Sequence, residues 1–76
     1  MNVKRREQLR RAVNLINSAR DIVEIITDEE TDSADNMPEN LQTGDKYEKM
    51  LYAIECLEDT TTHLDNAIEN IENALY

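Results

Sequence analysis

The chain holds one proline and one glycine, and both lie in a single stretch, Asn36–Gly44. On either side of this stretch, apolar residues recur at helical spacing and no residue breaks the pattern. Pro38 disfavours the helical conformation at Met37, so a helix that arrives from the N-terminal side should end near Asn36. This stretch therefore predicts a bend between two long helices.

We expect an all-α fold with one domain that spans residues 1–76. The first helix covers about 2–36, the bend 37–44, and the second helix about 45–75. Either Asp45 or Thr43 has the chemistry to cap the start of the second helix. A loop this short returns the second helix antiparallel to the first, which gives a coiled-coil-like two-helix hairpin.

The first helix carries a seven-residue repeat, which is typical of helices that pack along a narrow seam. One seam position holds Leu9, Ile16, Val23, Glu30 and Met37. The companion position, three residues later, holds Ala12, Ala19, Ile26 and Ser33. Further apolar residues widen the stripe: Val13, Leu15, Ile22, Ile25 and Ala34.

The second helix shows the same repeat more clearly. One seam position holds Tyr47, Ile54, Thr61, Ile68 and Leu75, and the other holds Met50, Leu57, Leu64 and Ile71. Only Thr61 interrupts these nine apolar positions. The repeat therefore predicts which face of this helix meets the first helix.

Charges and leftover apolar residues extend the prediction. The basic residues Lys4, Arg5, Arg6, Arg10 and Arg11 should face Asp65, Glu69 and Glu72 at the end of the second helix. Leu41, the apolar residue of the bend, should close the open end of the hairpin. A hairpin cannot cover Leu15, Ile22, Ile25 and Leu51 as well, so we expect a homodimer that forms a four-helix bundle.

The net charge of −9 restricts the partners. Phosphate repels such a surface, so direct nucleic-acid binding is disfavoured. No apolar run is long enough to span a bilayer, and nothing resembles a secretory signal. The single cysteine, Cys56, cannot form an internal disulfide. A cytoplasmic protein without membrane association is the expectation.

No set of residues indicates catalysis. His63 is predicted to be a solvated helix residue, because nothing completes an acid–base pair with it. Acidic neighbours disfavour a reactive thiolate at Cys56. The acidic run at residues 28–35 lacks the ligand order and central glycine of a calcium loop. We therefore expect no enzyme activity, no metal and no cofactor.

The bend and the start of the second helix carry a resemblance. The segment Asp35-Asn36-Met37-Pro38-Glu39-Asn40-Leu41-Gln42, followed by Tyr47-Glu48-Lys49-Met50, resembles small acidic proteins of bacteriophages and mobile elements. In those proteins an Asn-Met/Leu-Pro-Glu-x-Leu/Phe-Gln turn joins two long helices. The resemblance covers roughly residues 22–75. It implies a helical hairpin of phage origin whose function is undefined.

The sequence favours a non-enzymatic protein–protein interaction module that binds a host or phage protein through carboxylates. The candidate residues are Asp28, Glu29, Glu30, Asp32, Asp35, Glu55, Glu58 and Asp59. Regularly spaced carboxylates present a field like that of phosphates, so the module could inhibit a host defence or nucleic-acid enzyme as a decoy. The alternative is a structural coiled-coil protein that acts in assembly and inhibits nothing.

Overall fold

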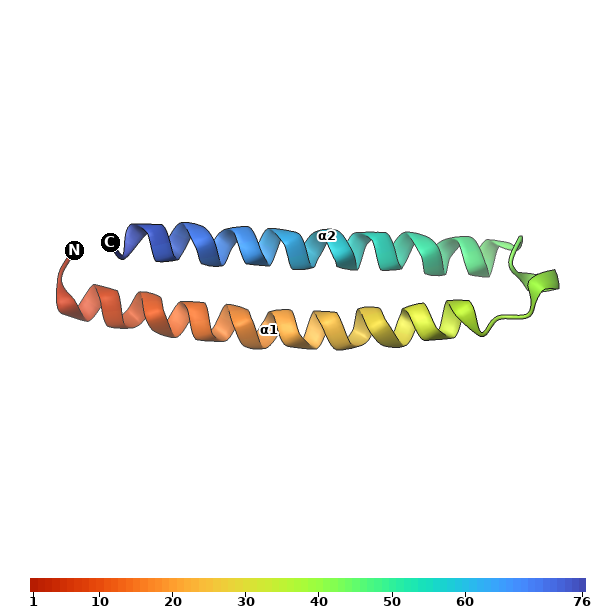
Figure 1. Ribbon diagram of the computed structural model, residues 1–76, viewed down its shortest axis with the longest axis horizontal. Helices are drawn as coiled ribbons and strands as arrows, with labels where there is room; N and C mark the ends of the chain where they lie inside the picture. Colours follow the sequence, from red (N-terminus) through yellow and green to blue (C-terminus); the bar gives the residue numbers. More distant parts are fainter.

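The computed structural model describes all 76 residues, Met1–Tyr76. Helix α1 spans Val3–Asp35, a short 3-10 helix η1 spans Glu39–Leu41, and helix α2 spans Asp45–Ala74. The two long helices run antiparallel as a rod of 59 × 15 × 13 Å, with both termini at one end and η1 at the other (Figure 1). The all-α hairpin expected from the sequence is confirmed, and the helix limits agree to within one residue.

The two helices begin differently. The Asn2 side chain accepts a hydrogen bond of 2.8 Å from the Arg5 backbone N–H, which caps α1. Helix α2 is preceded by Gly44, which has no side chain to offer, so the expectation of Asp45 or Thr43 as the cap was wrong. Asp45 and Glu48 instead lie in the first turn of α2, where their charges favourably meet the positive end of the helix dipole.

The bend is held together by hydrogen bonds rather than by apolar packing. The Leu41 N–H donates to the Pro38 carbonyl at 2.8 Å, and the Gln42 side-chain amide donates to the Met37 carbonyl at 2.9 Å. Leu41 itself is 53% exposed. The expectation that Leu41 closes the hairpin was therefore wrong. Gln42 ties the end of α1 to the bend because it satisfies a free backbone carbonyl there.

The seam predicted for α2 faces α1. Its members Tyr47, Met50, Ile54, Leu57, Leu64, Ile68 and Ile71 are all partly buried. Thr61 and Leu75, which belong to the same repeat, are partly buried as well. A regular apolar repeat of this length lies on a single face of the helix, so the sequence was sufficient to identify the face of α2 that packs against α1.

The seam of α1 was only half predicted. Leu9, Ile16, Val23, Glu30 and Met37 are partly buried, as expected. The second seam position lies four residues later rather than three, so it holds Arg6, Val13, Arg20, Thr27 and Ala34. Ile26, Ala19 and Ser33 are exposed, and Ala12 is partly buried. Ile26 is therefore not part of the seam between α1 and α2, because α1 turns Arg20, Thr27 and Ala34 toward α2 instead.

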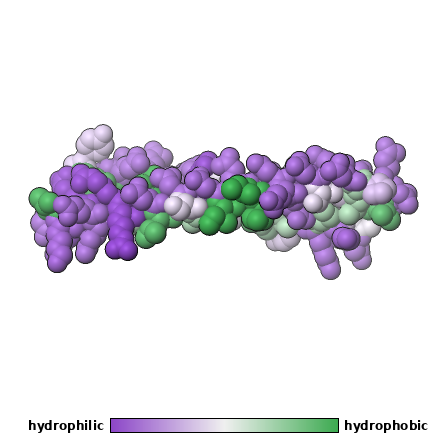
Figure 2. Space-filling model, turned by 90° about the horizontal axis from the view of Figure 1, so that it is seen from below, coloured by the Kyte–Doolittle hydropathy of each residue, from purple (hydrophilic) through white to green (hydrophobic).

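This rotation leaves an apolar stripe in solvent. Leu15, Ile22, Ile25 and Ile26, which we call the apolar stripe, are 46–63% exposed. Only Ala34 and Thr27 are buried in the whole chain. Figure 2 shows a cluster of apolar side chains near the middle of a face dominated by hydrophilic residues. The hairpin alone therefore hides little of its apolar surface.

Gly44 generates a stability prediction. Its φ of −88° suits any residue, and an added Cβ would make only an ordinary contact of 3.6 Å with the Leu41 carbonyl. Gly44→Ser should raise the free energy of unfolding by about 0.5–1 kcal/mol, because serine caps the helix and restricts the unfolded chain. Urea denaturation followed by circular dichroism measures it. Gly44→Ala, which lacks the hydroxyl, is the control; equal gains for both variants would exclude the cap.

Candidate functional site

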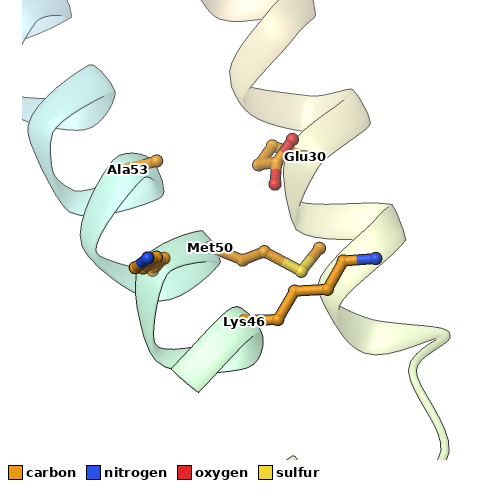
Figure 3. Close-up of a pocket in the computed structure, with 5 residues that line it drawn as sticks. Glu30, Lys46, Met50 and Ala53 are labelled. Atoms are coloured by element: carbon orange, nitrogen blue, oxygen red, sulfur yellow. The ribbon is translucent and has the colours of Figure 1, made fainter. Parts of the chain in front are cut away.

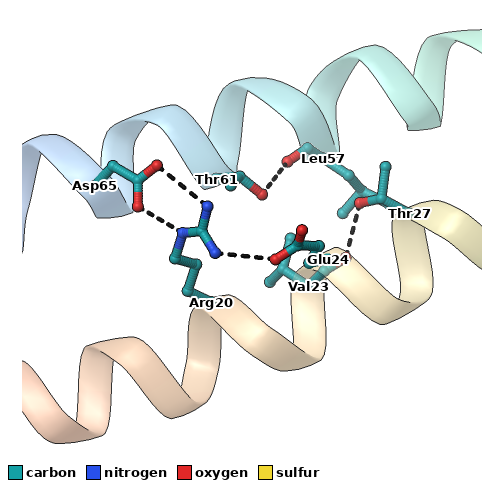
Figure 4. Close-up of polar contacts among 7 residues, drawn as sticks. All are labelled: Arg20, Val23, Glu24, Thr27, Leu57, Thr61 and Asp65. Carbon is teal, nitrogen blue, oxygen red and sulfur yellow. Dashed lines mark hydrogen bonds and ion pairs between the residues drawn. The ribbon is translucent and has the colours of Figure 1, made fainter.

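The centre of the seam is polar. Arg20 of α1 donates to both oxygens of Asp65 on α2, through Nε at 2.5 Å and through Nη2 at 3.4 Å. Its Nη1 donates to Glu24 at 2.9 Å (Figure 4). These are the two ion pairs of the structure. The hydrogen bond and charge of Asp65 raise the pKa of Arg20, so this residue stays charged until strongly alkaline pH.

Threonines occupy the neighbouring seam positions and satisfy their own hydroxyls. Thr27 donates to the Val23 carbonyl at 2.7 Å, and Thr61 donates to the Leu57 carbonyl at 3.3 Å (Figure 4). Thr31 donates in the same way to the Thr27 carbonyl at 2.8 Å. Because each hydroxyl bonds to its own helix, these residues add no hydrogen bond between α1 and α2.

One side of the seam is acidic. An open depression there is lined by Glu24, Thr27, Asp28, Thr31, Glu58 and Thr61. It brings Asp28 of α1 and Glu58 of α2 to one place, and both were candidate residues from the sequence. Asp65 continues the same side toward the termini. A cationic or hydrogen-bonding group of a partner would meet carboxylates from both helices here.

Glu30 lies apart from that depression. It shares a different open depression with Lys46, Lys49, Met50 and Ala53, in which Lys46 and Met50 extend from α2 toward α1 (Figure 3). Glu30 is partly buried at a seam position, and two lysines lie nearby. We therefore remove Glu30 from the free acidic surface.

The other predicted carboxylates do not gather into one site. Glu29, Asp32 and Asp35 on α1 and Glu55 and Asp59 on α2 are exposed and make no ion pair. They contribute to the field around the rod rather than to a shaped pocket.

The net charge is concentrated at one end of the rod. Residues 25–59, which we call the bend half, hold eleven of the 17 carboxylates and two of the eight Lys and Arg residues. The remaining residues hold six of each, so the terminal half is neutral overall. The whole net charge of −9 therefore lies in the bend half.

The basic residues near the N-terminus lie beside the end of α2, as expected, but they pair differently. Arg6 donates to the Leu75 carbonyl at 2.5 Å, which satisfies a free backbone group at the negative end of the helix dipole. Arg10 shares a depression with Glu72, Leu75 and Tyr76. The expected ion pairs with Asp65, Glu69 and Glu72 do not form, and Asp65 pairs with Arg20 instead.

Sequence reasoning missed Arg20, and it placed Arg6 beside the end of α2 with a carboxylate rather than the Leu75 carbonyl as its partner. A signal was present, since both residues continue the seven-residue spacing of Val13, Thr27 and Ala34. Arginine at such a position can lie along the seam with its stem and carry its charge to the edge.

The isolated reactive groups are at the surface. His63 and Cys56 are exposed. The pKa of Tyr52 is raised, chiefly by the neighbouring Cys56 side chain and then by desolvation and the charge of Glu55. No three His, Cys, Asp or Glu side chains come together in a way that could hold a metal ion. None of the helices combines the length and apolar character needed to cross a membrane.

A scan against protein-family models found no match to this chain. Searches of curated proteins and of solved structures found none either.

Arg20→Gln tests the link between the helices. The melting temperature should fall by a few degrees at low salt, because a charged hydrogen bond across the seam is lost. The loss should shrink in about 1 M NaCl, where charges are screened beyond roughly 3 Å. In an Asp65→Asn background the same change should have little effect. Lys4→Gln, an exposed residue without an ion pair, is the control. Equal losses from Lys4→Gln and Arg20→Gln would contradict the assignment.

Proposed function

We propose that the chain is a non-enzymatic protein–protein interaction module, encoded by a bacteriophage and active in the host cytoplasm. It binds a basic surface of a host or phage protein through the acidic bend half. In its sharpest form it inhibits a host defence or nucleic-acid enzyme by occupying the site that phosphates would occupy. The observation that carries this proposal is the confinement of the entire net charge to one end of the rod.

The geometry of the carboxylates supports a decoy. Asp28 and Glu58 project into one depression from two helices, with Glu24 beside them. Carboxylates spaced along a rigid rod offer a basic groove a series of negative charges without the flexibility of a loop. Such a field also speeds the approach of an oppositely charged partner.

The apolar stripe supports a homodimer, in which two hairpins form a four-helix bundle. Its four residues are exposed side by side on one helix, and single hairpins of this size have little core of their own. In a dimer the acidic depression, which lies on the other side of the seam, stays open to a partner.

The same stripe favours a second candidate function, that of an assembly protein whose role is helix association alone. Under this alternative the surface carboxylates tolerate substitution, and only the apolar residues matter. The two candidate functions therefore differ in whether binding depends on the carboxylates or on the apolar residues.

Charge reversal tests the first candidate. Affinity capture from host lysate with the wild-type protein, followed by mass spectrometry, supplies the partner. Asp28, Asp32 and Asp35, which are exposed, are then changed to lysine together. Capture of that partner in low salt should fall at least tenfold, while circular dichroism stays helical, because cations suit the end of α1 better than carboxylates do.

The matched control changes Glu7, Asp21 and Glu69 to lysine. These exposed residues lie in the neutral terminal half, so the net charge changes equally but at the other end. This control should capture the partner nearly as well as wild type. Equal capture by both triple variants at wild-type level would refute the decoy and favour the assembly protein.

A further inference from the structure

The apolar stripe lies near the middle of α1 and has a charged segment on either side. Its outer members, Leu15 and Ile26, are centred between residues 20 and 21, close to the midpoint of the helix Val3–Asp35. On its N-terminal side are five basic residues, Lys4, Arg5, Arg6, Arg10 and Arg11. On its C-terminal side are five carboxylates, Asp28, Glu29, Glu30, Asp32 and Asp35. If a second α1 packed against this one in the antiparallel direction, the basic segment of each would therefore lie along the acidic segment of the other.

We propose that α1 of one copy packs antiparallel against α1 of a second copy, stripe to stripe, about a two-fold axis near residues 20 and 21. This inference rests on the proposed homodimer and adds its orientation and register. The occupant of the stripe is a second copy of this chain.

The register follows from the spacing. When the two stripes are centred on each other, residue 5 of one copy lies opposite residue 36 of the other, and residue 11 lies opposite residue 30. Arg11 of one copy then lies beside Glu29 of the other, on the same side of the two-fold axis. The same contacts recur on the other side of the axis, as a two-fold interface requires.

The reverse orientation is electrostatically poor. A parallel pair would bring two bend halves together, each with a net charge of −9, and would place the basic segments side by side. Each exposed ion pair contributes at most about 1 kcal/mol, so the charges choose the orientation while the apolar contact supplies affinity.

The neighbouring surface of α2 allows a close approach. Ile26 precedes Glu30 by one turn, and Glu30 shares a depression with Ala53 of α2. The seven-residue spacing then places Thr60 and Ala67 farther along the same side. Side chains this small leave room for a second helix along the middle of the rod, while Lys46 and Lys49 line the same depression nearer the bend. Full overlap of rods 59 Å long gives an area of the order of the roughly 800 Å² per partner found in stable dimers.

Spin-label distances test the proposal on the full chain. In a Cys56→Ser background, one label is placed at Ser18 and, in a second protein, one at Gln8, both exposed on α1. Dipolar broadening of the continuous-wave spectrum at short range and double electron–electron resonance at long range then measure the distance between the two copies. At Ser18, close to the axis, we expect roughly 10–20 Å, the sum of a small axial offset and the spacing of packed helices. At Gln8, about twelve residues from the axis, we expect roughly 40 Å.

The outcomes separate the two levels of the proposal. Short distances at both sites mean a parallel dimer and overturn the orientation alone. A long distance at Ser18 means that another face is used and overturns the stripe contact. No dipolar signal at either site means a monomer and removes the homodimer itself.

Two substitutions test whether the apolar stripe forms the contact between the two copies. Ile22→Asp in the Ser18-labelled protein should abolish the dipolar signal while the helix content stays high, because Ile22 lies outside the hairpin seam. Tyr52→Asp, at an exposed apolar residue of α2, should leave the signal unchanged. A signal that survives Ile22→Asp would contradict the proposal.

Discussion

Two helices share only one seam, and that constraint governs the rest of this structure. Whatever apolar residues lie elsewhere on either helix stay in water unless something else covers them. Here the seam of α1 takes in Arg20, Thr27 and Glu30, while Leu15, Ile22, Ile25 and Ile26 are left outside. The polar seam is tolerated because Arg20 reaches Asp65 and the threonines bond to their own helix. The hairpin therefore has few apolar contacts between its helices and leaves apolar side chains of α1 exposed.

This division gives the rod two different long sides. One side carries the acidic depression that contains Asp28 and Glu58, and the other continues from the apolar stripe toward Ala53 of α2. A dimer that uses the apolar side leaves both copies of the acidic side exposed. Binding at the depression with Asp28 and Glu58 would then not compete with self-association, while Glu29 would pair with Arg11 of the second copy. Two such depressions would offer a partner bivalent contact. In the proposed dimer, the difference in charge between the two ends of the rod favours an antiparallel arrangement of the two copies.

The sequence was sufficient for the hairpin, because a lone proline between two uninterrupted repeats has one simple solution. It was sufficient for the seam of α2 as well, where a single regular repeat leaves no choice of face. It was insufficient for α1, whose apolar residues form two overlapping stripes; the larger one, with Ile26, looked like the seam. The choice between them depends on Arg20 and its partner Asp65, which lie 45 positions apart. The sequence was also insufficient for the bend. There the Gln42 side chain bonds to the Met37 carbonyl, whereas Leu41, which was expected to close the hairpin, is exposed. Of the acidic candidates, only Asp28 and Glu58 meet, because helix rotation decides which carboxylates share a side.

The claim that most of this depends on is that the apolar stripe is covered by a second copy in solution. Sedimentation equilibrium of the purified chain at micromolar concentration tests it directly. We expect a mass twice that of the 8.8 kDa chain. A single species at 8.8 kDa across the micromolar range would contradict it.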